Sequence, residues 1–274
     1  MDYHSLLTMV PFFIGLGTLV GFMAGLLGVG GGVLLVPGLF YGMTAMGFDQ
    51  AELMHMAVGT SLAVILPTGM SSARAHWRRG GVRVDLLKKF TPGIVAGVVI
   101  GTFVAKHVSS EELKIIFASM LVVLAIIMNI DATRYSLGDG LPAQPWPGVA
   151  GGVIGFLATM MGIGGATITI PYMTLYRVPI AQAVGTASAM GIIIATFAVI
   201  GFLSIGVGQE TTLPPFSLGY INMLAWVLIV PASVLMAPLG AHYAHSLPVK
   251  TLRRIFSVFL FCMAAWMIAG LFLD

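Results

Sequence analysis

The sequence predicts an all-α polytopic membrane protein made of two inverted repeats of five elements each, with glycine-rich broken or re-entrant helices. The 274 residues are 58% hydrophobic and 8% charged, and the mean hydropathy is +1.00, whereas a soluble domain carries about 25% charged residues. The apolar runs have the length of membrane helices, ~17–25 residues, rather than that of barrel strands. A glycine-rich motif also occurs twice, at corresponding places in the two halves.

Hydropathy divides the chain into ten apolar elements, five in each half. The segment 131–147 carries three prolines and several charges, so we expect it to be a linker between a first repeat at 1–130 and a second repeat at 148–274. The expected elements are 5–28, 30–46, 53–73, 90–107, 113–130, 147–162, 165–177, 182–206, 219–245 and 252–272.

The first two elements of each half meet at the glycine-rich motif. It reads GFMAGLLGVGGGVLLVP from Gly21 to Pro37 and GFLATMMGIGGATITIP from Gly155 to Pro171. Consecutive glycines are poor helix residues, so each stretch is expected to break. Irregular backbone at membrane depth is tolerated only where protein or a water-filled cavity surrounds it. Paired interruptions in two halves therefore indicate a transport site.

The remaining elements repeat in the same order. In the third elements, AVGTSL at 57–62 resembles AVGTAS at 183–188, and in the fourth elements Pro92 corresponds to Pro231. Both fifth elements open on a leucine followed by a basic residue. We therefore expect an internal repeat that extends over the whole chain.

Charge predicts how the repeats are oriented. Five elements per repeat is an odd number, so the second repeat is expected to be upside down relative to the first. The segment 74–89 carries six basic residues against one acidic residue, while its counterpart 207–218 has no basic residue. By the positive-inside rule the first lies in the cytoplasm and the second outside, which places both termini outside. Arg74, Arg78 and Arg79 could collect anions at the cytoplasmic mouth or anchor on lipid headgroups.

The breaks predict an anion site made of backbone. The first four N–H groups of a helix have no partner within it, and the N-terminus carries about half a positive charge. Such an end binds an anion without a cationic side chain, and glycine lets the oxyanion come close. We expect substrate contacts from Gly30, Gly31 and Gly32 and from Gly164 and Gly165. The alternative is that these glycines only let two helices cross closely.

Hydroxyl groups in the repeated third-element motif are further candidates. Thr60, Ser61, Thr186 and Ser188 could donate to oxyanion oxygens or, alternatively, bond a carbonyl one turn back. All ten acidic residues lie in loops or at element ends, which argues against carboxylate-coupled pumping. The titratable side chains near the spans that could shuttle protons are His55, His242 and His245.

These residues resemble a known family. GLLGVGGGVLLVP, AVGTS and HWRRGGVRVD at 76–85 are similar to motifs of the TauE/SafE family of bacterial sulfite exporters, and the likeness covers nearly the whole chain. It implies a transporter of the bacterial inner membrane, not an enzyme, that exports sulfite or a related small sulfur-containing anion. The expected mechanism is alternating access, with no cofactor, no metal and no nucleic-acid partner. Ala166 stands where the first copy has Gly32, so the two breaks are not equivalent.

Two other functions fit parts of the sequence. Eighteen methionines, including Met54 and Met56 around His55, could serve a soft metal such as copper, but methionine is more often a packing residue. An intramembrane hydrolase could use Ser61 or Ser188, but a nucleophile needs a positioned base, and the sequence contains no HExxH motif and no serine elbow.

Overall fold

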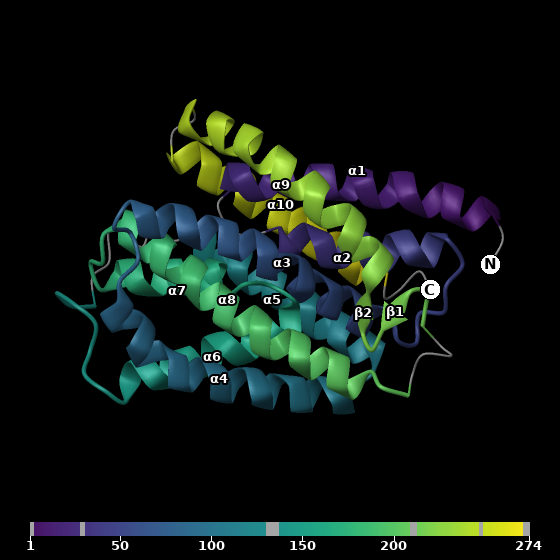
Figure 1. Ribbon diagram of the computed structural model, residues 1–274. Helices are drawn as coiled ribbons and strands as arrows, with labels where there is room; N and C mark the ends of the chain where they lie inside the picture. The colour runs from purple at the N-terminus through teal and green to yellow at the C-terminus, as the bar shows by residue number, and fades with distance from the viewer. Residues whose placement is uncertain (1–2, 28–30, 130–136, 209–212, 247–248, 271–274) are drawn as a thin grey trace.

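The computed structural model describes residues 3–27, 31–129, 137–208, 213–246 and 249–270 (Figure 1). Within these ranges the chain forms ten α-helices and a two-stranded antiparallel hairpin. The elements are α1 (Tyr3–Leu27), α2 (Gly32–Ala45), α3 (Leu53–Arg78), α4 (Val84–His107), α5 (Ser110–Asn129), α6 (Trp146–Met161), α7 (Ala166–Leu175), α8 (Ile180–Ile205), β1 (Ser217–Leu218), β2 (Ile221–Asn222), α9 (Met223–Ser246) and α10 (Val249–Ala269).

Each expected element corresponds to one helix, and the largest differences are at the ends of α3 and α4. α3 continues to Arg78, five residues past the expected end, because alanine and arginine are good helix formers even where the apolar run stops. It ends where Gly80 adopts a positive φ of 67°, a conformation that favours glycine. α4 begins at Val84, six residues before the expected start. Hydropathy locates the apolar part of a helix, and the helix itself extends beyond it.

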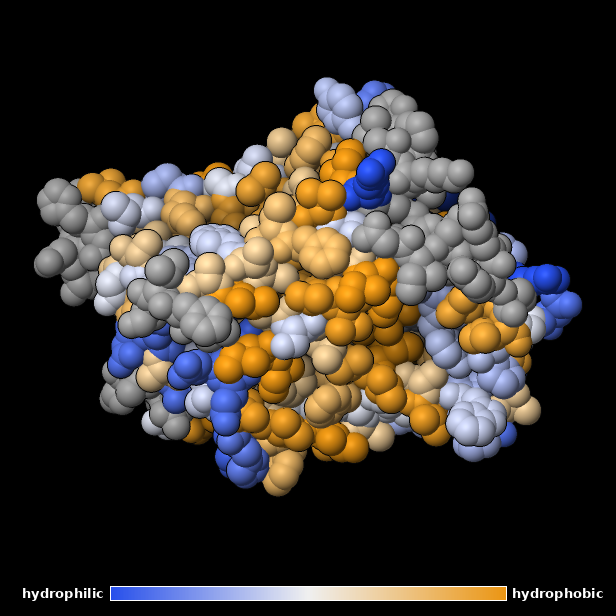
Figure 2. Space-filling model, turned by 180° about the vertical axis from the view of Figure 1, so that it is seen from behind, coloured by the Kyte–Doolittle hydropathy of each residue, from blue (hydrophilic) through white to orange (hydrophobic). Residues whose placement is uncertain are grey.

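Apolar side chains cover much of the outer surface (Figure 2). Phe103 is 65% exposed and Leu235 is 74% exposed, and soluble monomers rarely expose large contiguous apolar patches. Within the described residues, five helices are long and apolar enough to cross a bilayer: Leu7–Leu26, Leu53–Arg78, Val84–His107, Ile180–Ile205 and Met223–Gly240. The fold is therefore that of an all-α, multi-pass membrane protein.

The long helices form two close pairs on either side of a central pair. α1 lies along α9, α4 lies along α6, and α3 and α8 pack together between these pairs (Figure 1). α3 is the most enclosed, with 72% of its span buried against 33% for α8. Glycines allow the outer pairs to approach: a Cβ on Gly21 of α1 would lie 2.3 Å from the Ser233 carbonyl oxygen of α9. A Cβ on Gly97 of α4 would lie 2.0 Å from the Gly152 carbonyl oxygen of α6. Small residues at helix crossings are a common device of membrane bundles.

Both glycine-rich motifs interrupt the helices, as expected. α1 ends at Leu27 and α2 begins at Gly32, while α6 ends at Met161 and α7 begins at Ala166. α2 and α7 are 14 and 10 residues long, which is too short to span a bilayer at 1.5 Å per residue. The starts of these short helices are buried, as Gly32, Val33 and Thr167 show, so their backbone faces a neighbouring segment or a cavity.

Candidate functional site

The second break is shaped by left-handed backbone. Gly162, directly after α6, has a φ of 63°, and Gly165, directly before α7, has a φ of 72°. Residues with a Cβ rarely adopt this conformation, so glycine is required here by the backbone itself. The N–H of Ile163 donates to the Ala158 carbonyl at 3.0 Å and closes the end of α6. The chain is then free to start α7 in a new direction.

The two breaks touch each other. A Cβ on Gly32, the first residue of α2, would lie 2.6 Å from the carbonyl oxygen of Gly162 and 3.2 Å from the Cα of Ile163. Ser61 of α3 donates to the same Gly162 carbonyl at 2.7 Å. Since no side chain fits between these segments, the contact requires glycine at position 32.

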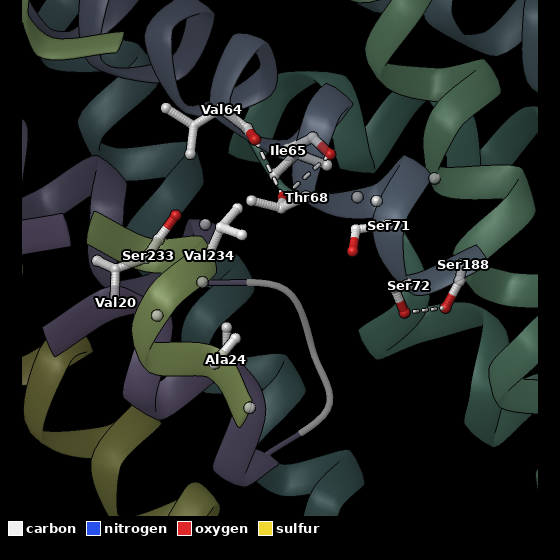
Figure 3. A pocket seen from close by; sticks show the side chains of 18 of the residues that line it. Val20, Ala24, Val64, Ile65, Thr68, Ser71, Ser72, Ser188, Ser233 and Val234 are labelled. Atoms are coloured by element: carbon white, nitrogen blue, oxygen red, sulfur yellow. Dashed lines mark hydrogen bonds between the residues drawn. The ribbon is translucent and has the colours of Figure 1, made fainter. Parts of the chain in front are cut away.

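A cavity of about 400 Å³ lies beside this contact (Figure 3). Its walls come from α1, α3, α8 and α9 and from the starts of α2 and α7. Of the glycines expected to contact substrate, Gly31, Gly32 and Gly164 line it. Gly165 lies outside the lining and packs against Ile194. Gly30 is outside the described residues.

One wall of the cavity is polar. Thr68, Ser72 and His76 are spaced four residues apart and therefore follow one face of α3. Ser72 Oγ lies 3.2 Å from Ser188 Oγ of α8 (Figure 3), and Ser188 also donates to the Val184 carbonyl at 2.9 Å. We call Thr68, Ser72 and His76 the α3 polar stripe.

The facing wall is mostly apolar and made of small side chains from α1 and α9. In Figure 3, Val20 and Ala24 of α1 and Val234 of α9 lie across the cavity from Thr68 and Ser72 of α3, together with the hydroxyl-bearing Ser233. Within the described residues no acidic side chain lines the cavity. The arrangement offers hydroxyl groups, backbone and one imidazole to a solute, without a carboxylate that would repel an anion.

The Gly-Thr pair of the third-element motif serves a different contact. Thr60 Oγ1 accepts the N–H of Asn222 at 2.9 Å, just before α9, and Thr186 Oγ1 accepts the N–H of Arg83 at 2.9 Å, just before α4. Neither threonine lines the cavity. Each threonine thus binds the backbone immediately before the fourth helix of the other half.

The glycine that precedes each of these threonines allows the loop to approach. A Cβ on Gly59 would lie 2.3 Å from the Tyr220 carbonyl oxygen, and a Cβ on Gly185 would lie 2.4 Å from the Gly81 carbonyl oxygen. We call these two matching contacts the Gly-Thr clamps. Of the four hydroxyl residues expected at the site, only Ser188 lines the cavity.

The two ends of α3 differ. At its start, the ring of His55 stacks on Tyr220 with centroids 5.1 Å apart, and Nε2 of His55 lies 2.8 Å from the Ala105 carbonyl oxygen. The hydroxyl of Tyr220 donates to Glu52 at 2.6 Å, and burial raises the pKa of Tyr220. This end is closed by packed side chains and by the hairpin.

The other end of α3 is rich in positive charge. Arg74, Arg78 and Arg79 are exposed, and none of them lines the cavity. Arg83 in the following loop forms an ion pair with Asp85 at 2.6 Å, and this hydrogen bond raises the pKa of Arg83. The lining residues of α3 come from this end of the helix, so the cavity lies in the half of the molecule that carries the arginines.

The described residues of the soft-metal alternative lie away from the cavity, since neither His55 nor Met54, Met56 or His242 lines it. Within the described part of the chain, no three or more His, Cys, Asp or Glu side chains come together. Met54 and Met56 are fully buried in the core beside His55. His242 is exposed, and the side chain of His245 is outside the described part of the structure.

Comparison with known proteins identifies the family. Residues 13–267 match the family model described as sulfite exporter TauE/SafE. The chain belongs to the TauE/SafE family. This TauE/SafE protein is 33% identical to a probable membrane transporter protein of Haemophilus influenzae, over 94% of this chain and 97% of that one. It is 28% identical to the probable membrane transporter protein YunE of Bacillus subtilis, over 92% and 95% of the two chains.

A third relative matches over a similar length. The probable membrane transporter protein of Methanocaldococcus jannaschii is 27% identical over 98% of both chains. No solved structure matches this TauE/SafE protein significantly. Together with the apolar helices, the family and these relatives make the chain a multi-pass membrane transporter.

Proposed function

We propose that this protein exports sulfite, or a related small sulfur-containing anion, across the bacterial inner membrane. The observation that carries the proposal is the cavity beside the contact of the two glycine breaks, lined by Gly31, Gly32 and Gly164. α2 and α7 start there, and helix starts offer N–H groups and a partial positive charge. The hydroxyl groups of the lining also suit an anion, and so does the absence of acidic side chains among the described lining residues.

Energetics permit export without a coupled ion. A membrane potential of 100 mV, negative inside, favours the outward movement of an anion by about 2.3 kcal/mol per charge. Since 1.4 kcal/mol is a factor of ten, this supports a gradient of roughly forty-fold per charge. Two helix starts contribute at most ~2 kcal/mol each, so the anion is held weakly enough to leave.

The proposal includes an inverted repeat, with 1–130 as the first copy and 148–274 as the second. Two reciprocal pairs of contacts and one contact between equivalent helices support it. The first helix of each half packs along the fourth helix of the other, as α1–α9 and α6–α4. The fifth helices, α5 and α10, pack on each other. The Gly-Thr clamps join the halves reciprocally, with their loop partners Arg83 and Asn222 139 residues apart.

Alternating access is supported by a difference between the two halves. Four residues of the α4–α6–α8 contact, Ile94, Val98, Ile154 and Ile194, are fully or almost fully buried. Their counterparts in the repeat are Ser233, Ala237, Val20 and Thr68, and these line the cavity. The first interface is thus filled by large side chains, whereas its counterpart borders the cavity, with Val20 and Ser233 only 3% exposed and Thr68 and Ala237 more accessible. Exchanging the two arrangements would close the present cavity and open one on the opposite face.

We also propose the orientation predicted from the charges, in which the cavity opens to the cytoplasm. The arginine-rich end of α3 is then inside by the positive-inside rule, and both termini are outside. The present arrangement is in that case the inward-facing one, ready to receive an anion from the cytoplasm, and Arg74, Arg78 and Arg79 would raise the local anion concentration.

The deciding experiment is transport by purified protein in liposomes. Sulfite, thiosulfate, sulfate, sulfoacetate and chloride are tested separately, with and without a pH gradient, against protein-free liposomes. We expect protein-dependent flux of sulfite or another sulfur anion above that of chloride. Flux of none of these anions, or transport that responds to copper instead, would contradict the proposal.

A further inference from the structure

Among the described residues that line the cavity, His76 is the one with a titratable side chain. It is the last residue of the α3 polar stripe, one turn beyond Ser72. Within the described residues its ring makes no hydrogen bond and no ion pair, so both ring nitrogens are available to a solute. A protonated imidazole donates from both nitrogens and carries a positive charge, whereas a neutral one donates from only one.

The backbone fixes where this ring lies. The His76 carbonyl accepts the N–H groups of Arg79 and Gly81 at 3.1 and 2.9 Å, which ends α3 at this point. Gly185 of α8 lies against the His76 Cβ, so that a Cβ at Gly185 would be 3.0 Å away. The ring therefore stands where α3 and α8 meet.

The charges around His76 are fixed, and imidazole is the side chain among them whose ordinary pKa lies near neutral pH. Among the described residues, the cavity walls from α1, α8 and α9 contribute no charged side chain. The charged groups near this end of α3 are Arg74, Arg78 and Arg79 on α3 itself, Arg83 in the following loop and Asp85 at the start of α4.

We propose that the protonation of His76 controls anion binding in the cavity. Protonated His76 binds the anion, whereas neutral His76 binds it only weakly. This rests on the proposed function and adds its regulation by cytoplasmic pH. Two of the other polar groups of the wall are already engaged, because Thr68 donates to the Val64 carbonyl and Ser188 to the Val184 carbonyl, and the hydroxyl of Ser71, which also lines the cavity, carries no charge at any pH of the test. A hydrogen bond to a charged group contributes more than one between neutral groups, so the charge on His76 decides the affinity.

The test compares variants with wild type at each pH, because the ratio of their rates cancels the protonation of sulfite itself. Efflux of radiolabelled sulfite is measured from proteoliposomes with equal pH on both sides, from pH 5.5 to pH 8.0, after subtracting the leak of protein-free liposomes. An ordinary histidine has a pKa near 6.5, and the range extends on both sides of this value. His76→Gln removes the charge, His76→Arg makes it permanent, and His107→Gln is the matched control, since His107 is exposed at the end of α4.

We expect His76→Gln to transport about tenfold more slowly than wild type at pH 5.5, a difference of about 1.4 kcal/mol, and within twofold of wild type at pH 8.0. His76→Arg should exceed His76→Gln about tenfold at pH 8.0, and His107→Gln should match wild type throughout. If the His76→Gln variant does not insert into the membrane as a folded protein, His76→Asn provides the same comparison. If the ratio of the His76→Gln efflux rate to the wild-type rate is constant across the pH range, the role of His76 is overturned and the export function stands. Wild-type protein that moves none of the anions overturns both.

Discussion

Replacing Gly32 by alanine tests whether the contact of the two breaks forms the transport site. The added Cβ would lie 2.6 Å from the Gly162 carbonyl oxygen, while ordinary van der Waals contact begins at 3.4 Å. The two breaks must therefore separate by about 0.8 Å. The obstacle is a backbone atom, so no rotation of a side chain relieves it, and overpacking of this kind costs about 1–3 kcal/mol.

The expected result is a selective loss of transport. A separation of this size disturbs the Ser61–Gly162 hydrogen bond and the helix starts at the cavity, and we expect sulfite efflux from proteoliposomes to fall at least tenfold, taking 1.4 kcal/mol as the effective cost. Efflux is normalised to the amount of protein that elutes as a single peak in size-exclusion chromatography, which separates lost activity from lost folding.

Gly15→Ala is the matched control. Gly15 lies in the middle of α1, and a Cβ added there would have no atom of a neighbouring element within 4 Å, so the same change meets open space. Alanine is also the better helix former, and this variant should transport at the wild-type rate. If Gly32→Ala transports as fast as Gly15→Ala, the contact between the breaks is not part of the transport machinery, and the assignment of the site is refuted.

Three further changes test other parts of the structure. Thr60→Val leaves the N–H before α9 without its buried acceptor, which should lower stability by about 1–3 kcal/mol and reduce the temperature of thermal unfolding. Ser72→Ala removes one hydroxyl from the cavity wall and its hydrogen bond to Ser188, so KM for sulfite should rise severalfold while the unfolding temperature falls by less than in Thr60→Val. In a Cys262→Ser background, which has no cysteine left, a cysteine in place of Arg78 should react with a membrane-impermeant maleimide only in inverted vesicles, and one in place of Val207 only in intact cells.

The elements and the breaks could be predicted because each depends on nearby residues. Apolar runs mark the positions of the ten helices of the described chain, five of which are long and apolar enough to cross a bilayer, and consecutive glycines are poor helix formers wherever they occur. The role of Gly165 is different: its positive φ of 72° already requires glycine, whether or not an anion is present. Its place in the motif therefore predicts a break correctly, while its contact with substrate stays a prediction.

The hydroxyl groups were harder to assign, because tertiary contacts decide their partners. Thr60 binds the backbone of Asn222, 162 residues later, and no local pattern indicates this pairing. The α3 polar stripe did leave a signal, since Thr68, Ser72 and His76 recur every fourth residue in an apolar helix. That signal is weak on its own, because serine and threonine in membrane helices commonly bond a carbonyl of their own helix, as Thr68 does here.

The α3 polar stripe has a consequence for the kinetics of the whole cycle. Its counterparts on α8 are Ile194, Ala198 and Phe202, which are all fully buried and apolar. In the proposed alternating-access cycle, a solute leaving through the opposite face would meet a surface that offers it no polar group, so the half-saturation concentration on that face should far exceed the one on the arginine side. By detailed balance the membrane potential alone sets the final concentration gradient. The difference between the two cavity walls would nevertheless make release of the anion to the outside fast and its rebinding from the outside weak.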